Sequence, residues 1–286
     1  MNLNNKVVVI TGSTRGFGRS IAEEMLAGGA RVVVSGRKQT DVDKVVVELD
    51  KRGQVSGLAC DVSVAEDVYA LARHAIQTYG QIDVWINNAG VTPTAGGILD
   101  FAPEVAEQTF RVNCVGTISG TQAALHYMKP AGSGTIVSLY GRGSDLRAAT
   151  PSGLYGATKA WITSFTRTMA KEYADLGVNF VGFSPGMMFT DMLDVQEVVG
   201  EQIAMTMKNF PMALKALGNP PDVPARELVH LLETNEKPFV EYKLMSGLRL
   251  MKMMTKFAWM GMNKKARPAE QEFTILPVFE APVERD

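Results

Sequence analysis

The stretch KVVVITGSTRGFG, from Lys6 to Gly18, decides the fold class of this 286-residue chain. Its first half is a run of β-branched residues, which is typical of a buried strand. Glycines at positions 12, 16 and 18 follow directly and lead into a helical pattern that ends near Gly28. Glycine permits a tight turn and lets the backbone approach a pyrophosphate at the N-terminus of a helix. The stretch therefore predicts a strand, turn and helix that bind a dinucleotide.

The glycine spacing is G-x-x-x-G-x-G rather than the commoner G-x-G-x-x-G. Such a motif is weak evidence alone, because an ordinary strand–helix turn can also be rich in glycine. The strand before it and the helix after it favour the binding interpretation. We expect the cofactor to contact the whole turn: Gly12, Ser13, Thr14, Arg15, Gly16, Phe17 and Gly18.

Outward from this stretch, short apolar runs alternate with longer helical patterns. Further strands are predicted at 30–37, 54–62, 81–90, 134–140 and 177–186. The alternation predicts an α/β protein with a Rossmann-type doubly wound parallel sheet between two helical layers. From 187 onward the pattern is helical and rich in methionine, and 269–286 has the composition of a loosely ordered tail. We expect one Rossmann-type domain over 1–240 and a helical C-terminal extension over 241–286.

Composition argues against several other classes of protein. A net charge of −1 gives no long-range attraction to nucleic acid. Cys60 and Cys114 are too few for a disulfide framework, and with three scattered histidines they predict no metal site. No apolar run reaches the length of a bilayer span, and the chain enters its first strand at once, without a targeting segment. We expect a cytoplasmic protein, with membrane association as an open alternative.

The end of the second predicted strand indicates which dinucleotide binds. It reads VSGR (34–37), with Ser35 and Arg37 where an NAD-dependent enzyme usually places an acid for the ribose 2′-hydroxyl. Arg15 in the glycine-rich turn adds a second guanidinium, and two guanidiniums suit a 2′-phosphate. The alternative is that both arginines are solvated surface charges. We therefore expect NADP(H) as the cofactor, with Ser35 and Arg37 among its contacts.

Tyr155 and Lys159, in the segment YGATK, form a pair suited to proton transfer. One helical turn separates them, so both project from the same face. A nearby ammonium and a cationic nicotinamide would lower a tyrosine pKa that is ordinarily about 10. Tyr155 could then give its proton to a carbonyl oxygen, or take one in the opposite direction, while Lys159 also holds the cofactor ribose. The alternative for Tyr155 alone is a half-buried packing residue.

Four motifs, TGSTRGFG (11–18), NNAG (87–90), YGATK (155–159) and SPGMMFT (184–190), resemble those of short-chain dehydrogenase/reductases in order and spacing. The resemblance covers about residues 5–192 and implies hydride transfer to or from a carbonyl group. It implies that Asn113 helps to hold Lys159 through water. It also implies a homodimer or homotetramer packed through helices near 104–128 and 155–175. The cofactor contacts that it implies are Asp61 and Val62 at the adenine, Asn88, Ala89 and Gly90 at the middle, and Pro185, Gly186, Met188 and Thr190 at the nicotinamide.

The catalytic serine of that family is absent from its usual place. In GTIVSLYGRGSD (134–145), Tyr140 and Gly141 occupy the positions of the family's two strand-end serines. Ser144 follows two glycines that free the backbone to turn, and it is the preferred replacement. Ser138 and Tyr140 are the alternatives, and they share one face of the strand. Asp145 either orients Ser144 or forms a turn.

The segments GRGSD, LYGATK and 237–261 narrow the resemblance to the chlorophyll b reductase branch of the family. This implies NADPH-dependent reduction of the formyl group of chlorophyll(ide) b to hydroxymethyl. Another bulky apolar ketone, aldehyde or alcohol is an alternative substrate. The displaced serine leaves a non-catalytic NADP(H)-binding protein as a further alternative.

The segment 243–267 is basic and rich in methionine. No acidic residue occurs between 243 and 269, and the basic residues are Lys243, Arg249, Lys252, Lys256, Lys264, Lys265 and Arg267. One interpretation is a helix docked on its own domain or on a partner subunit. A second is a pliable lid over a large flat substrate, because methionine adapts to irregular apolar shapes. A third is peripheral attachment to anionic lipid.

Overall fold

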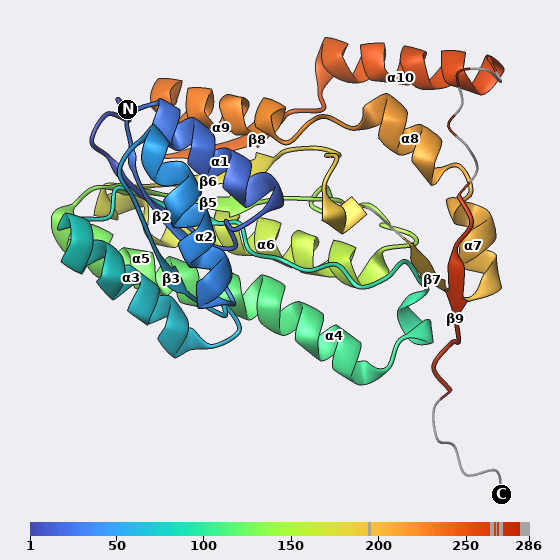
Figure 1. The fold of residues 1–286 in the computed structure, drawn as a ribbon, viewed down its shortest axis with the longest axis horizontal. Coiled ribbons are helices and arrows are strands. Elements are labelled where there is room, and N and C mark those ends of the chain that lie inside the picture. Colours follow the sequence, from blue (N-terminus) through green and yellow to red (C-terminus); the bar gives the residue numbers. More distant parts are fainter. Residues whose placement is uncertain (194–195, 264–265, 267, 269–270, 281–286) are drawn as a thin grey trace, which may run out of the picture.

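The computed structural model describes the chain except for residues 194–195, 264–265, 267, 269–270 and 281–286. Its centre is a parallel seven-stranded sheet with the order β3-β2-β1-β4-β5-β6-β8 (Figure 1). The strands are β1 (Val7–Ile10), β2 (Arg31–Gly36), β3 (Val55–Ala59), β4 (Val84–Asn87), β5 (Gly134–Leu139), β6 (Val178–Ser184) and β8 (Phe239–Lys243). The predicted doubly wound parallel sheet is confirmed.

Helices cover both faces of this sheet and complete three layers (Figure 1). On one face lie α1 (Gly16–Ala27), α2 (Gln39–Leu49) and α9 (Asp222–Thr234). On the other lie α3 (Ala65–Tyr79), α5 (Gly116–Ala131) and α6 (Gly153–Glu172). The helix α4 (Pro103–Phe110) runs into α5 through a π-helical turn at Arg111–Val115.

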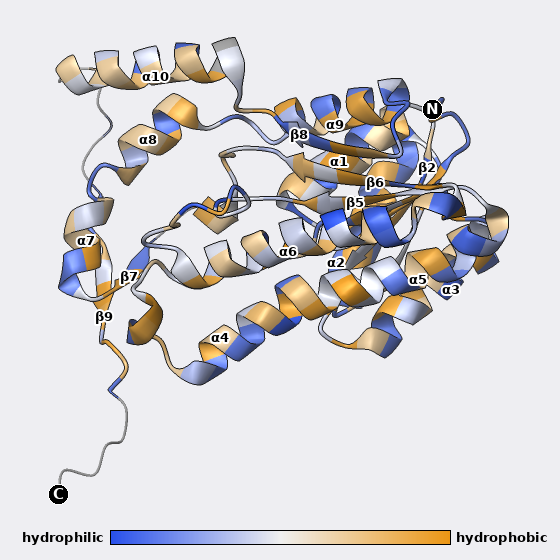
Figure 2. Cartoon of the chain, turned by 180° about the vertical axis from the view of Figure 1, so that it is seen from behind, coloured by the Kyte–Doolittle hydropathy of each residue, from blue (hydrophilic) through white to orange (hydrophobic). Residues whose placement is uncertain are grey.

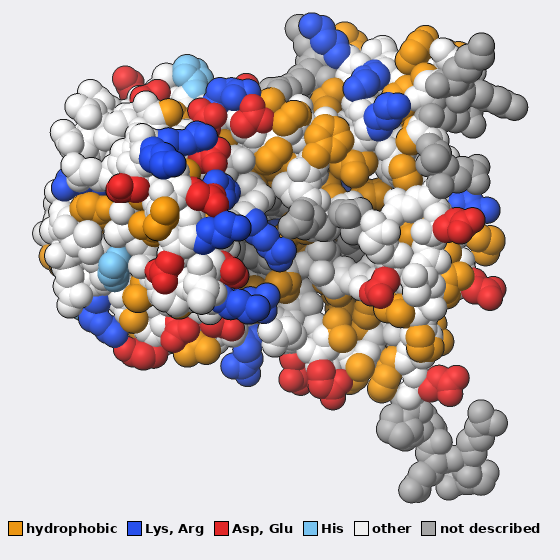
Figure 3. Space-filling view, viewed as in Figure 1, with side chains coloured by type: hydrophobic (Ala, Val, Ile, Leu, Met, Phe, Trp, Pro, Cys, Tyr) orange, Lys and Arg blue, Asp and Glu red, His pale blue; other side chains and the backbone are white. Residues whose placement is uncertain are grey.

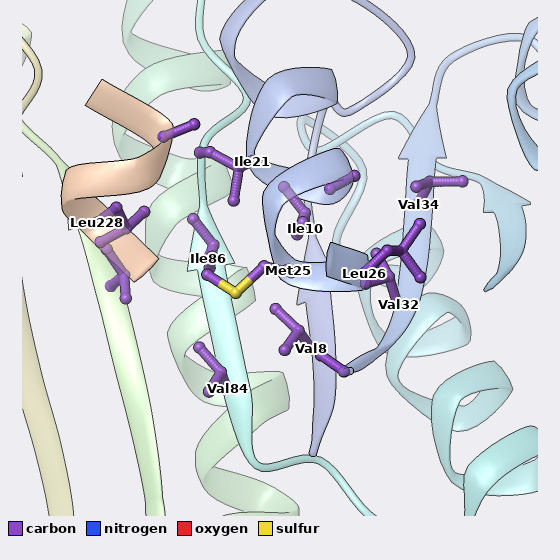
Figure 4. Close-up of a cluster of buried hydrophobic side chains, with 14 of the residues drawn as sticks. Val8, Ile10, Ile21, Met25, Leu26, Val32, Val34, Val84, Ile86 and Leu228 are labelled. Atoms are coloured by element: carbon purple, nitrogen blue, oxygen red, sulfur yellow. The ribbon is translucent and has the colours of Figure 1, made fainter. Parts of the chain in front are cut away.

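Alternation along the strands separates two apolar cores. Val8 and Ile10 of β1 contact the core under α1, whereas Val9 between them belongs to the opposite core. Figure 4 shows the first core, where Ile21 and Met25 of α1 lie over β1 and β4. Each fully buried aliphatic side chain contributes about 1.5–3 kcal/mol. This packing fixes the strand ends from which the functional loops begin.

The strand order reverses between β1 and β4. The chain adds β2 and β3 on one side of β1 and then returns to place β4 on the other side. The loops that follow β1 and β4 therefore diverge at the carboxyl edge of the sheet. Open α/β sheets bind their ligands in the crevice at such a reversal.

The C-terminal half of the sheet differs from the prediction. The residues Phe239–Lys243 form β8 and pair with β6, although the pattern after 187 predicted only helices. This edge strand alternates between partly buried and exposed positions, so it lacks the continuous apolar run of the inner strands. The predicted boundary after residue 240 lies inside β8.

The prediction of a loosely ordered tail over 269–286 is wrong in part, because Thr274–Leu276 forms the strand β9. It pairs in parallel with β7 (Glu197–Val199), and Val198 of β7 bridges to Ala95 in the loop after β4. The Phe279 amide also donates to the Asp100 carbonyl at 2.9 Å. Residues 274–279 thus lie beside β7 and the β4–α4 loop. A strand of three residues has too little periodicity to be found in the sequence.

Within the described part of the chain, the helices α7 (Glu201–Met207), α8 (Phe210–Leu217) and α10 (Gly247–Met262) lie outside the layered domain. Figure 2 shows α10 along α8 at one edge of the molecule.

Across the described ranges, no helix combines the length and the apolar character that crossing a membrane requires.

Candidate active site

The glycine-rich turn between β1 and α1 forms a narrow cradle. A Cβ atom on Gly12, which has a φ of 63°, would lie 2.9 Å from the Ala89 Cα atom. A Cβ atom on Gly18 would lie 2.4 Å from the Asn88 Nδ2 atom, so a larger residue does not fit there either. The N-cap residue Arg15 makes no side-chain capping bond, which leaves the first backbone N–H groups of α1 for an anion. These features fit the pyrophosphate of a dinucleotide.

Asn88 and Thr11 fasten the two sides of the crevice to each other. The Asn88 Nδ2 atom donates to the carbonyl oxygens of Thr11 and Gly12 at 2.8 and 2.9 Å. The Thr11 hydroxyl accepts hydrogen bonds from the Asn88 and Ala89 amides, both at 3.0 Å. The side chain of Asn88 thus shapes the predicted cofactor site from behind. The sequence analysis missed the role of Thr11, although Thr11 opens the TGSTRGFG motif.

Ser13 and Ser35, two predicted cofactor contacts, turn their hydroxyls into the protein. The Ser13 Oγ atom donates to the Ile10 carbonyl at 2.8 Å and accepts from the Ser35 amide at 2.9 Å. The Ser35 Oγ atom also donates to Ile10, at 3.3 Å. Both side chains therefore tie the turn to β2. On the side of the turn that faces the crevice, a cofactor would meet the backbone and the neighbouring arginines.

Arg15 and Arg37 lie on adjacent segments, as the prediction of a 2′-phosphate site requires. Gly36 packs against Thr14, since a Cβ atom on Gly36 would lie 2.6 Å from the Thr14 Cγ2 atom. The two arginines follow these contacting residues in the chain, and both are exposed. Two exposed guanidiniums, one in the β1–α1 turn and one after β2, suit a phosphate.

The remaining predicted cofactor residues line the same edge of the sheet. The Asp61 Oδ1 atom accepts bonds from the amide and the hydroxyl of Ser63, which fixes the turn containing Val62. The segment 184–190 returns over the glycine-rich turn: a Cβ atom on Gly16 would lie 3.8 Å from Thr190. Within this segment, Gly186 packs against Met245 and Met188 bridges to Asn219.

Tyr155 and Lys159 lie one turn apart near the start of α6, as predicted. The Lys159 Nζ atom is 5.5 Å from the centre of the Tyr155 ring and donates to the Leu139 carbonyl at 2.8 Å. Burial raises the pKa of Tyr155 to about 12 and lowers the pKa of Lys159 to about 8. The lowered Tyr155 pKa that the sequence suggested depends on the cationic nicotinamide as well, so it stays a prediction for the complex with cofactor. Tyr155 is protonated at neutral pH, which is the form that an acid needs.

Asn113 lies in the π-helical turn and holds the start of α6. Its Oδ1 atom accepts from the Val91 amide at 2.8 Å, and its Nδ2 atom donates to the Val91 carbonyl at 2.9 Å and to the Thr158 hydroxyl at 3.0 Å. The Thr158 hydroxyl donates in turn to the Tyr155 carbonyl at 2.7 Å. π-Helical turns often occur at functional sites. Thr158 is a positioning residue that the sequence analysis missed, although it stands beside Lys159 in YGATK.

Gly141, in the place of the family's serine, lies directly against Tyr155. A Cβ atom on Gly141 would lie 2.6 Å from the Tyr155 Oη atom. The Gly141 amide donates to the Ser144 Oγ atom at 3.0 Å, and that hydroxyl donates to the Lys159 carbonyl at 3.3 Å. The structure thus brings Ser144, Tyr155 and Lys159 together around Gly141. Asp145 forms a turn, because its Oδ1 atom accepts from the Arg147 amide.

The two alternative hydroxyls point elsewhere. The Tyr140 hydroxyl donates to Glu241 of β8 at 3.0 Å, and Glu241 also pairs with Arg167 of α6. Ser138 is buried within β5, between β4 and β6, and lines neither of the pockets beside the β5–α6 loop. Neither residue is placed to hold a substrate oxygen next to Tyr155.

Two pockets flank the β5–α6 loop. The first has a volume of about 320 Å³, and its floor includes Gly141, Ser144 and Ser184. Its rim carries three basic side chains and one acid: Arg142, Arg147, Lys243 and Asp145. The second, of about 550 Å³, is lined mainly by small and apolar residues of the β4–α4 loop, the β5–α6 loop and the start of α6. A substrate in the first pocket can therefore reach Ser144 and also Gly141, which lies against Tyr155, although Tyr155 itself lines neither pocket.

A crevice at the strand-order reversal, a glycine cradle and a tyrosine beside a buried lysine define an oxidoreductase that uses a nicotinamide dinucleotide. Comparison with known families agrees with this class. The short chain dehydrogenase family model matches residues 6–198. The chain belongs to the short-chain dehydrogenase family.

Two relatives show the range of activities near this sequence. The probable chloroplastic chlorophyll(ide) b reductase of Arabidopsis thaliana is 35% identical over 205 residues, which are 65% of this chain and 41% of the plant protein. The chain thus spans less than half the length of that relative. Dehydrogenase/reductase SDR family member 4 of Homo sapiens is 34% identical over 227 residues, which are 77% of this chain and 78% of the human protein.

Two solved structures resemble the whole domain. The 3-ketoacyl-(acyl-carrier-protein) reductase from Brucella melitensis, complexed with NADH, has a TM-score of 0.74 and 25% identity, covering 86% of this chain and 99% of its own. An alcohol dehydrogenase from Thermococcus sibiricus, complexed with 5-hydroxy-NADP, shares the fold with a TM-score of 0.71 and 24% identity, covering 84% and 96%. Both forms of the dinucleotide thus occur on this fold.

Proposed function

We propose that this protein is an NADP(H)-dependent carbonyl reductase. The observation that carries the proposal is Tyr155 beside Lys159, with its hydroxyl against Gly141, a residue that lines an open pocket. A phenol with a pKa of about 12 keeps its proton until a developing alkoxide takes it.

Each residue of the site has its own role in the reduction of a carbonyl group. When bound, NADPH would supply the hydride that the carbonyl carbon receives. Tyr155 gives its proton to the carbonyl oxygen, and Lys159 holds the ribose and stabilises the resulting tyrosinate. Ser144 is the proposed second donor to that oxygen, for which its hydroxyl must turn away from the Lys159 carbonyl, and Asn113 keeps α6 in place. In the oxidative direction Tyr155 takes the proton from an alcohol.

The preference for NADPH over NADH rests on Arg15 and Arg37. Replacing Arg37 by Glu removes a cation that would pair with the 2′-phosphate and adds a repelling charge. We expect kcat/KM for NADPH to fall by about 10- to 100-fold and that for NADH to change little, since a charged contact contributes about 1.5–3 kcal/mol. Equal losses for both cofactors would contradict the assignment.

The first substrate to test is chlorophyll(ide) b, with reduction of its formyl group to hydroxymethyl. The similarity to the plant reductase and the large apolar surface of the second pocket support this choice. The basic rim of the first pocket favours the free acid, chlorophyllide b, over the esterified pigment. Bulky apolar ketones and aldehydes are the alternative substrates.

The test is NADPH oxidation with these substrates and mass-spectrometric detection of the alcohol. Tyr155→Phe keeps the ring but removes the acid, so we expect its turnover to fall by about 100-fold or more. Ser144→Ala should lower kcat by about 100-fold if the hydroxyl holds the carbonyl oxygen. An unchanged rate in the Ser144 variant would remove that residue from the mechanism.

A non-catalytic NADP(H)-binding protein is the second candidate, favoured by the glycine at the family's serine position. It predicts cofactor binding, measurable by calorimetry, without turnover of any carbonyl compound. Product formation that depends on Tyr155 would exclude it.

A further inference from the structure

The helix α10 has two apolar sides, and only one of them is docked on the protein. Met253 and Phe257 are partly buried and Met260 is 2% exposed, which marks the side that packs on α8. The Lys256 Nζ atom adds a bond to the Lys215 carbonyl at the end of α8, at 3.0 Å. Packing on α8 accounts for the apolar residues on this inner side of α10, but not for those on its outer side.

The outer side of α10 is a stripe of exposed apolar residues. Large side chains that are 38–80% exposed form it: Leu250, Met251, Met254, Trp259 and Met262. They fall at helical spacing, so they share one face of this 16-residue helix. Figure 2 shows hydrophobic residues through the length of α10. Such a continuous exposed apolar face marks an interaction surface.

The lysines beside this stripe indicate which kind of partner it binds. Lys252 and Lys256 are exposed and, by helical geometry, lie between the outer stripe and the docked side. In Figure 3 basic and hydrophobic side chains lie together along the α10 edge of the molecule. No acidic residue occurs from 243 to 269. A second copy of the same face would bring lysine against lysine, whereas an anionic surface complements both.

We propose that the outer face of α10 binds the surface of an anionic lipid bilayer. The helix lies in the plane of the interface, with its methionines and Trp259 among the upper acyl chains. Lys252 extends from the edge of the stripe to the lipid phosphates, and Lys256, whose Nζ atom bonds to α8, adds positive charge beside it. Unbranched methionines suit an irregular lipid surface. Lys264, Lys265 and Arg267 continue the basic sequence outside the described residues.

Trp259 reports directly on insertion. The other two tryptophans serve as internal controls, because Trp85 is fully buried and Trp161 is stacked on Phe165 of α6. The full chain is mixed with vesicles of phosphatidylcholine, with or without phosphatidylglycerol, that carry brominated acyl chains. We expect quenching of tryptophan fluorescence with the anionic vesicles only, and its loss in Trp259→Phe.

Charge variants test the lipid preference by co-sedimentation. The double variant Lys252→Glu with Lys256→Glu should bind anionic vesicles at least about tenfold more weakly, because each lysine near the surface contributes about 1 kcal/mol. The matched control is Lys44→Glu, an exposed lysine on α2, which should bind as the wild type does. Met254→Asp should also abolish quenching.

Three results would overturn the proposal. One is the absence of co-sedimentation with anionic vesicles at low salt. Another is binding that Lys44→Glu weakens as much as the α10 variant does. The third is an oligomer, seen by light scattering, that Met254→Asp dissociates without any effect on vesicle binding, because the stripe would then be a protein interface. Circular dichroism checks that each variant is folded, which we expect since all substituted side chains are exposed.

Discussion

Gly141 and Tyr155 are in such close contact that a side chain at position 141 needs Tyr155 to move. Restoring the family's serine by Gly141→Ser should therefore lower kcat, by about 100-fold if the reacting oxygen shifts by about 1 Å. Gly141→Ala is the matched control for bulk, because its Cβ atom meets the same Tyr155 Oη atom at 2.6 Å. Steady-state kinetics of both variants measure the effect. Higher activity in the serine variant than in the alanine variant would mean that the new hydroxyl takes over the missing role.

Lys159 should give the reaction a pH limit. Burial lowers its pKa from 10.5 to about 8, so it is charged below about pH 8 and neutral above. Tyr155, with a pKa of about 12, stays protonated throughout this range. Because a charged Lys159 is needed to hold the cofactor ribose, kcat/KM for NADPH, which reports ionisations of the free enzyme, should fall above about pH 8. A profile that is flat from pH 6 to about pH 10 would contradict this assignment.

Among the elements, α6 depends on an anchor that comes from the π-helical turn. Thr158→Val removes the acceptor of the Asn113 Nδ2 bond in a buried place, which costs about 1–3 kcal/mol. We expect a lower free energy of unfolding in urea and a lower kcat, because Tyr155 is held through the same hydroxyl. Thr109→Val in α4 is the control, since its buried hydroxyl bonds only within its own helix. It should lose stability without a comparable loss of kcat.

The whole molecule presents an aromatic surface on α4 and α6 that suits a homo-oligomer. Phe110 is 45% exposed and meets Trp161 edge to face at 5.8 Å, and Trp161 stacks on Phe165 at 5.0 Å. We expect a homodimer or homotetramer in light scattering, and Phe110→Asp should dissociate it by burying a charge in the interface. Val47→Asp, at an exposed position on α2, is the control. A monomeric wild-type protein would contradict the prediction.

Much of this architecture follows from local sequence. The glycine-rich turn after β1 and the Tyr155–Lys159 spacing could be predicted, because each depends on residues close together in the chain. The sheet could be predicted because its inner strands are buried on both faces and read as continuous apolar runs. The edge strand β8 and the short β9 could not be predicted, because partners distant in sequence stabilise them.

The replacement for the missing serine also depends partly on local sequence and partly on contacts between distant segments. Sequence spacing restricts the candidates to Ser138, Tyr140 and Ser144, but it cannot rank them with certainty, because the backbone between Gly141 and Gly143 can turn in several ways. Long-range packing directs the Tyr140 hydroxyl to Glu241, 101 residues away, and the Ser144 hydroxyl to the Gly141 amide and the Lys159 carbonyl, so Ser144 stays the predicted replacement. The proton-transfer pair Tyr155 and Lys159 can thus be predicted from the sequence, because one helical turn separates the two residues. The hydroxyl that replaces the family's serine cannot be identified from the sequence, because its position depends on contacts between segments that meet only in the folded chain.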